Sequence, residues 1–157
     1  MCLALQQAAL AAEHGEVPVG ALLLHEGVSY PAHNAPISQH DTTAHAEIRA
    51  IRAASLAANN YRLPGATLYV TLEPCCMCAG AIIHARIARL VYAADDPKTG
   101  AAHSLYHLLS DPRLNHQVEI CRGVMADESA QLLRDFFSQR RAARQSSPAA
   151  CASLPKI

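Results

Sequence analysis

Two thiols and an imidazole in this sequence have the residue types and spacing of a metal site. Cys75 and Cys78 stand three residues apart directly after Pro74, between an apolar, β-prone run and a helix-compatible run. If Pro74 lies at or just before the first helical turn, the two thiols lie one turn apart on one face. The unpaired N–H groups and the positive dipole end at a helix N-terminus favour thiolates. The pair therefore supplies half of a tetrahedral zinc site.

His45 can complete this set as a neutral imidazole. It begins the segment His45-Ala46-Glu47, which opens another helical pattern upstream. Three protein ligands leave one position for water, and this separates a catalytic zinc from a closed structural one. Glu47 is not needed as a ligand and is well placed as a general acid/base beside the metal. A His-x-Glu with a later Pro-Cys-x-x-Cys is the established signature of zinc nucleobase deaminases.

Length and composition favour one globular domain. The chain has 157 residues, of which 51% are hydrophobic and 17% are charged, and this suits a single core. The formal net charge is zero, whereas a nucleic-acid binder is often basic. This neutral charge balance argues against binding along an extended nucleic-acid duplex but allows a small, shape-specific RNA contact. Because no run of about eighteen apolar residues occurs, no membrane span is expected.

The cysteines indicate a reducing, cytoplasmic environment. Six are present, and an even count would suggest disulfides in a small secreted protein. Here the core is adequate and two cysteines have metal-ligand spacing, which fits a reducing cytosol better. The segment 1–8 lacks a basic region and contains two glutamines, so we do not interpret it as a signal peptide.

Hydrophobic patterns predict alternating strands and helices over residues 1–144. Helices are expected at 1–14, 43–59, 75–88 and 126–144, with a short helix through Leu105, Leu108 and Leu109. Strands are expected at 17–25, 28–34, 66–72, 89–94 and 117–121, the second of them at a sheet edge because it contains Pro31. Residues 145–157 are rich in Ser, Pro and Ala, so we expect a disordered C-terminal tail.

This order of elements predicts an α/β fold. One five-stranded mixed sheet would carry helices on both faces, as a three-layer α/β/α sandwich. The helices starting near residues 43 and 75 would then have their N-termini at the same edge of the sheet. This convergence would bring His45 to Cys75 and Cys78. Thr42 or Thr43 can cap the first of these two helices.

On these motifs the chain resembles the cytidine deaminase superfamily and, within it, the bacterial tRNA-specific adenosine deaminases. The similar blocks are 16–21, 45–48, 61–63, 66–78 with Gly80, 98–102, 115–116, 118–120, 135–137 and 140–141. The zinc motif specifies only the superfamily, whereas the loop at Lys98 and the helix with Phe136 and Phe137 narrow the resemblance to the tRNA enzymes. Ala35, Asp95 and His103 depart from the usual family residues, which bears on tRNA affinity more than on chemistry.

The resemblance implies a reaction and a set of roles. His45, Cys75 and Cys78 match the ligands of one Zn²⁺ per subunit, and Glu47 matches the proton shuttle. Asn34 matches a base-contacting asparagine, and Asp96 lies in the loop expected to touch the anticodon backbone. Members of the family are homodimers with the substrate groove near the subunit interface. The implied reaction is zinc-dependent hydrolysis of the wobble adenosine of a tRNA anticodon to inosine.

Lys98, Arg140 and Arg141 are the basic residues available to bind phosphate. A solvated helix face is the alternative interpretation of Arg140 and Arg141. Phe136 and Phe137 suit either the core alone or the core and an interface. Glu73 is expected to be structural, bonding backbone near the metal turn.

The sequence is also compatible with two other functions. A zinc deaminase of free guanine or cytosine would share every zinc residue, although the 98–103 loop and the Arg-rich last helix favour a tRNA substrate. A non-catalytic, zinc-stabilised RNA-binding or scaffold module is the alternative from another class. Glu47 argues against that module, because a structural site has no use for a carboxylate beside an open coordination position.

Overall fold

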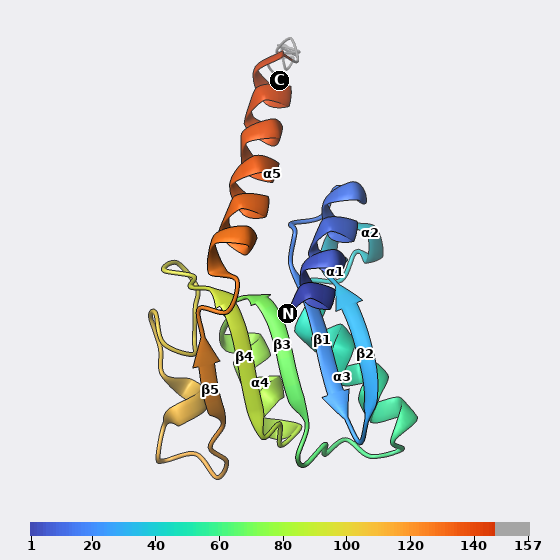
Figure 1. Cartoon of the computed structure of the whole chain (residues 1–157), viewed down its shortest axis with the longest axis vertical. Helices are drawn as coiled ribbons and strands as arrows, with labels where there is room; N and C mark the ends of the chain where they lie inside the picture. The colour runs from blue at the N-terminus through green and yellow to red at the C-terminus, as the bar shows by residue number, and fades with distance from the viewer. Residues whose placement is uncertain (147–157) are drawn as a thin grey trace, which may run out of the picture.

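A mixed five-stranded sheet covered by helices on both faces forms the protein (Figure 1). The computed structural model describes residues 1–146. The strands are β1 (Gly20–His25), β2 (Val28–His33), β3 (Thr67–Leu72), β4 (Arg89–Ala94) and β5 (Glu119–Arg122). The helices are α1 (Cys2–Glu13), α2 (Pro36–Gln39), α3 (Ala46–Ala57), α4 (Cys76–His84) and α5 (Ala126–Ser146), with a 3₁₀ turn η1 (Leu108–Ser110).

The strands lie in the order β2-β1-β3-β4-β5. β1 pairs antiparallel with β2 and β3, and β3, β4 and β5 are parallel to one another. The predicted mixed sheet is therefore confirmed. β2 lies at the edge, as Pro31 predicted, because a proline cannot donate to a second neighbour.

Helices cover the two faces of the sheet in pairs. α1 packs on β1 and β2 on the near face in Figure 1, whereas α5 contacts β3 and β4 near its start and then projects beyond the end of the sheet. α3 and α4 lie on the far face and contact each other. A Cβ at Gly20 would overlap backbone atoms of Ala4 and Ala8, so α1 rests directly on β1 at this point. The predicted three-layer arrangement is confirmed.

The main core lies between the sheet and the α3/α4 layer. It contains fully buried side chains from the sheet and from the helices on this side, including Leu23, Leu68, Ile82, Leu90 and Tyr92. Such apolar burial provides the rigid base on which helix N-termini can be held. Among the described helices, none combines the length and apolar character that a bilayer-spanning segment requires.

Several boundaries differ from those predicted. α3 begins at Ala46 with His45 as its N-cap residue, not at Thr43. Thr43 instead donates from its amide and its hydroxyl to Asp41, at 2.8 and 2.7 Å. β1 begins at Gly20 rather than at residue 17, and the expected helix through Leu105 is reduced to η1.

α5 continues to Ser146, so the first two residues of the expected tail are helical. The expectation of disorder for 147–157 lies outside the residues that the structure describes.

The short helix α2 was not predicted. It has four residues and begins with Pro36. The buried carboxylate of Glu16 accepts from the amides of Ile37 and Ser38, at 3.2 and 2.7 Å. This tertiary contact holds the segment between β2 and α3 beside the sheet edge.

Candidate active site

The N-termini of α3 and α4 bring the three predicted donor residues together. β2 and β3 run in the same direction, because both are antiparallel to β1. The connections after these strands therefore lead to helices that start at the same edge of the sheet. His45 is the N-cap residue of α3, Cys75 is the N-cap residue of α4, and Cys78 lies in the first turn of α4.

The donor atoms of His45, Cys75 and Cys78 lie within 4.8 Å of one another. Nδ1 of His45 is 3.8 Å from Sγ of Cys75 and 3.5 Å from Sγ of Cys78. Cys78 is buried and the other two are half-buried. Two thiols and one imidazole nitrogen facing a common centre fit the donor set of a catalytic zinc, with one position left for a further ligand.

The contact between the two thiols shifts their pKa values in opposite directions. The hydrogen bond from the Cys78 thiol lowers the pKa of Cys75 to about 4, and the contact with His45 acts in the same direction. The hydrogen bond to Cys75, together with burial, raises the pKa of the Cys78 thiol. The thiolate form favoured at Cys75 is the form in which a cysteine binds a metal ion.

Glu47 is a buried carboxylate at the edge of this cluster. It lies in the first turn of α3 and is 3% exposed. Its Oε2 has no hydrogen-bond partner among the described residues. Burial raises the pKa of Glu47 above the usual range of a glutamic acid. A carboxyl with a raised pKa can both accept and return a proton near neutral pH.

A pocket of about 220 Å³ adjoins the donor cluster. Its lining includes His45, Glu47 and Cys75 from the cluster, and it also contains Val17, Val19, Asn34, Pro36, Leu72, Glu73, Asp96 and Thr99. This volume is smaller than the roughly 300–1,000 Å³ of typical drug-sized ligand pockets, so it suits one small group. Sequence reasoning missed the apolar members, whose only signal was their position at strand ends.

Asn34 is held in place by the helix that carries Glu47. It is 7% exposed, and its Oδ1 accepts from the amide of Ala46 at 2.9 Å. This bond satisfies one of the unpaired N–H groups at the start of α3. The side-chain amide group of Asn34 is then the part that remains to donate to a ligand.

Asp96 organises its own turn at the rim of the pocket. Its carboxylate accepts from the amides of Lys98 and Thr99, at 2.9 and 3.3 Å, and from the Thr99 hydroxyl at 2.5 Å. Asp96, which was predicted from the sequence, lines the pocket, and so does Thr99, which was not predicted.

The predicted basic residues gather beside the pocket rather than inside it. Lys98 and Arg141 line one depression, together with Leu133 and Phe137. Arg140 and Arg141 line a second depression, which also includes Val17, and Val17 is shared with the pocket near His45. Val17 therefore separates the pocket near the donor cluster from a depression beside the C-terminal half of α5.

The two phenylalanines of α5 have different environments. Phe136 is buried, whereas Phe137 is 43% exposed. Arg140 lies over the Phe136 ring, 5.4 Å from its centroid, and donates to the carbonyl of Gly15 at 3.1 Å. Phe136 thus belongs to the core and Phe137 to the surface. Arg140 is also partly committed to contacts within the chain.

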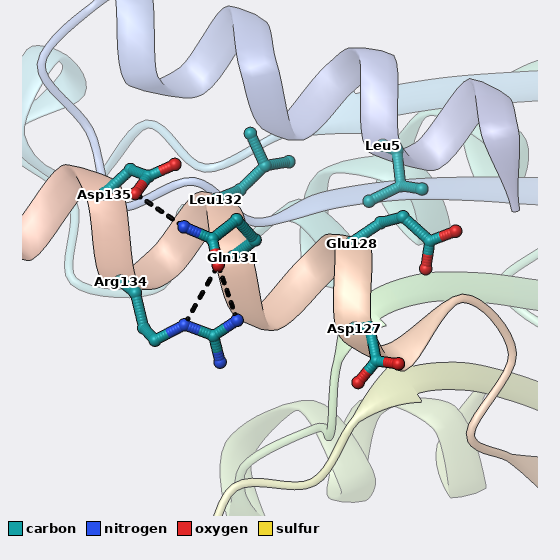
Figure 2. Close-up of a pocket in the computed structure, with 7 residues that line it drawn as sticks. All are labelled: Leu5, Asp127, Glu128, Gln131, Leu132, Arg134 and Asp135. Carbon is teal, nitrogen blue, oxygen red and sulfur yellow. Dashed lines mark hydrogen bonds between the residues drawn. The ribbon is translucent and has the colours of Figure 1, made fainter.

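A larger hollow of about 630 Å³ lies between α1 and α5, away from the donor cluster (Figure 2). Its residues include Leu5, Asp127 and Glu128. Gln131 donates to Asp135 and accepts from Arg134, both at 2.7 Å. None of its lining residues borders the pocket near His45. The larger volume of this hollow therefore does not identify it as the active site.

Comparison with known proteins defines the class. Residues 1–141 match the family model of the MafB19-like deaminases. A guanine deaminase of Nitrosomonas europaea has a similar fold, with a TM-score of 0.73 at 22% identity, over 86% of this chain and 81% of that one. The fold is therefore that of a cytidine deaminase-like protein.

More similar proteins narrow the family. The chain is 47% identical to the tRNA-specific adenosine deaminase of Haemophilus influenzae, over 98% of this chain and 90% of that protein. Identity to the tRNA-specific adenosine deaminase of Agrobacterium fabrum is 49%, over 90% and 93% of the two chains. A structure from a study of A-to-I editing by tRNA:A34 deaminases matches with a TM-score of 0.81 and 48% identity, over 85% of this chain and 97% of that chain. The chain belongs to the family of tRNA-specific adenosine deaminases.

Proposed function

We propose that this protein hydrolyses adenosine to inosine at the wobble position of a tRNA anticodon. The observation that carries the proposal is the unpaired Oε2 of buried Glu47 beside the His45, Cys75 and Cys78 donors. A small pocket adjoins them and has room for a single base. The relatives named above supply the substrate class.

Nδ1 of His45 and the two thiolates would hold one Zn²⁺ per chain. When bound, zinc would polarise a water molecule and lower its pKa toward about 7. The soft sulfur ligands and the imidazole favour zinc over magnesium or calcium, which prefer oxygen ligands.

Glu47 moves the protons of the reaction. It accepts one proton from the attacking water and delivers it to N1 of adenine as the C6–O bond forms. It then accepts the second proton from the new hydroxyl on C6 and delivers it to the departing amine, so that the C6=O bond forms as the C6–N bond breaks. One water is consumed and one ammonia is released. The raised pKa of Glu47 suits both proton acceptance and proton return.

Asn34 and the pocket walls orient the base. The free amide group of Asn34 donates to an acceptor on the purine edge, since its Oδ1 is held by Ala46. The apolar side chains of Val17, Val19 and Leu72 pack against the ring and exclude bulk water.

The surface beside the pocket suits an RNA loop. An anticodon loop presents a base that leaves its stack at little cost, and RNA is read through splayed bases and 2′-hydroxyls. Asp96 can accept from a ribose hydroxyl at the pocket rim. Lys98 and, on α5, Arg140 and Arg141 line the neighbouring depressions. There they would bind the phosphates that flank the target base.

A free-base deaminase is the second candidate, because the guanine deaminase named above shares the fold. The basic surface of Lys98 and Arg141 favours RNA, since a free base carries no phosphate for it to bind. Turnover should be measured side by side on an anticodon stem-loop, free adenosine, adenine, cytidine and guanine. The stem-loop should be processed far better than the others. Equal efficiency on any free base or nucleoside would favour the second candidate.

Two chains would associate through the α3/α4 face, giving a homodimer. Leu56 and Tyr61 on this face are 82% and 65% exposed. They border an apolar depression of about 510 Å³ that also includes Ile51, Ala81 and Ala85. Exposed apolar patches of this kind mark interfaces, and two-fold symmetry is the commonest closed arrangement. A cytoplasmic location is also part of the proposal; it is supported by the proposed tRNA substrate and by the free thiols of the described cysteines.

A further inference from the structure

The buried carboxylate of Glu73 accepts hydrogen bonds from several backbone amides of a neighbouring loop. Glu73 is 2% exposed and directly precedes Pro74 and Cys75. Its Oε2 accepts from the amide of Asp96 at 2.9 Å. Its Oε1 accepts from the three successive amides of 102–104, at 3.1, 2.7 and 2.9 Å. The hydroxyl of Ser104 donates to Oε2 as well.

The same loop is fastened to the backbone of the cysteine turn. Gly100 forms a β-bridge with Cys75, and the amide of Ala101 donates to the carbonyl of Pro74 at 2.8 Å. A Cβ at Gly100 would overlap both the Glu73 carboxylate and the Asp96 carbonyl. Residue 100 therefore has to be glycine for the loop to lie this close.

This loop carries much of the substrate surface. Asp96 and Thr99 line the pocket near His45, and Lys98 lines the depression beside α5. Fixing a backbone residue in one conformation has a substantial entropic cost, and a preordered loop incurs it on folding instead of on binding.

We propose that Glu73 is a positioning residue that orders the loop 96–104 for RNA. It joins this loop to the turn that bears Cys75, so that the pocket wall exists before substrate binds. The proposal rests on the proposed RNA substrate for its effect on turnover, but the ordering of the loop is independent of it.

Two substitutions at Glu73 should have graded effects. Glu73→Ala removes every acceptor of the network. Glu73→Gln keeps one carbonyl oxygen for the amides of 102–104 but turns an NH₂ group toward the Asp96 amide. KM for the stem-loop should rise by about tenfold or more in Glu73→Ala and by less in Glu73→Gln, because charge-assisted hydrogen bonds are lost. kcat should change much less, since Glu47 and the donor residues keep their places.

Asn115→Ala is the matched control. Asn115 also anchors a connection after β4, because its side-chain Oδ1 accepts from Arg86 at 2.9 Å beside a 2.8 Å bond to its backbone carbonyl. It lines no part of the pocket. Gly100→Ala tests the contact from the other side, because the added methyl group displaces the Glu73 carboxylate. Zinc content, thermal unfolding, KM and kcat are measured for all four variants. Amide hydrogen exchange is followed in a peptide covering 96–104 and in one covering α3.

In both Glu73 variants we expect faster exchange confined to 96–104, retained zinc and a raised KM. Asn115→Ala should leave these three readouts at wild-type values. Unchanged exchange in folded Glu73→Ala would overturn the proposal, and so would a loss of kcat at constant KM or a loss of zinc in folded Glu73→Gln. If exchange responds as expected while the wild-type enzyme fails to edit the stem-loop, the proposed substrate fails and the loop assignment stands.

Discussion

At the scale of single residues, the proposed mechanism assigns separate tasks to the three donor residues and to Glu47. His45, Cys75 and Cys78 face a common centre within 4.8 Å, whereas Glu47 lies beside them with an unpaired oxygen. Since tetrahedral zinc sites depend on every ligand, the first three should control metal content and Glu47 should not.

Cys78→Ala tests the proposed metal ligands. Cys78 is buried, so no neighbouring solvent-exposed thiol can move into its place without disturbing α4. The variant should lose stoichiometric zinc and lose stability with it, because metal binding contributes to folding. Metal analysis after dialysis is the measurement, with Cys121→Ala as a control outside the cluster. Tightly held zinc at one per chain in Cys78→Ala would show that the ligand assignment is wrong.

Asn34→Asp separates two functions of one amide. Aspartate keeps the oxygen that accepts from Ala46 and places a negative charge at the N-terminus of α3, which that helix tolerates well. It removes the amide group that donates to the base. The variant should fold with near-normal stability but lose turnover, whereas Asn34→Ala should also lose about 0.5–2 kcal/mol of stability. Normal kcat/KM in folded Asn34→Asp would contradict the donor role.

At the scale of elements, the site depends on where helices begin. The alternation of strands and helices predicted the sheet, the two layers and the convergence of His45 with Cys75 and Cys78. The start of α3 was predicted less well. Thr43 is a good cap by residue type, but Asp41 engages it, and Asn34 supplies an acceptor to Ala46 instead. Local residue preferences cannot show where a helix begins when a side chain distant in the sequence accepts from one of its first amides.

The other features that the sequence did not predict also depend on long-range contacts. α2 is too short to give a periodic pattern, and Glu16 from the loop before β1 holds it in place. The apolar wall of the pocket comes from strand ends and turns that are adjacent only in the folded chain. Glu73 was expected to be structural, but the loop that it anchors lies 23 to 31 residues away.

Surface charge at the loop 96–104 and α5 should appear in the salt dependence of RNA binding. Lys98→Ala and Arg141→Ala should each reduce the slope of log affinity against log salt by about 0.7 for a single-stranded contact. Arg113→Ala is the control of equal charge, because Arg113 pairs with Asp111 at 2.6 Å, away from the pocket. Stem-loop binding is titrated at several salt concentrations. Identical slopes for all three variants would remove Lys98 and Arg141 from the RNA surface.

At the scale of the whole molecule, one surface is proposed to bind RNA and a different, apolar surface is proposed to form the dimer. The pocket and the basic side of α5 face the proposed RNA. The exposed apolar side chains of α3 and the following loop, Leu56 and Tyr61, form the proposed dimer face. A net charge of zero means that local clusters, rather than the overall field, must attract RNA.

Leu56→Glu tests the proposed dimer face. Leu56 is 82% exposed, so the change should leave the fold of one chain intact. A charge buried in an apolar interface should weaken association by roughly tenfold or more. Sedimentation across a concentration series gives the dissociation constant. Leu3→Glu, at a 50% exposed position on α1, is the control and should associate like wild type. A wild-type mass of one chain at micromolar concentration would rule out the dimer.

The most direct test of the central claim is inosine formation by Glu47→Gln, measured together with its zinc content. Glutamine keeps the size of the buried side chain but cannot take up or return the proton. Wild-type protein should convert the wobble adenosine of an anticodon stem-loop to inosine. Glu47→Gln should keep its zinc and fold but lose turnover by about 10²- to 10⁴-fold or more. Near-normal inosine formation by zinc-loaded Glu47→Gln would contradict the account.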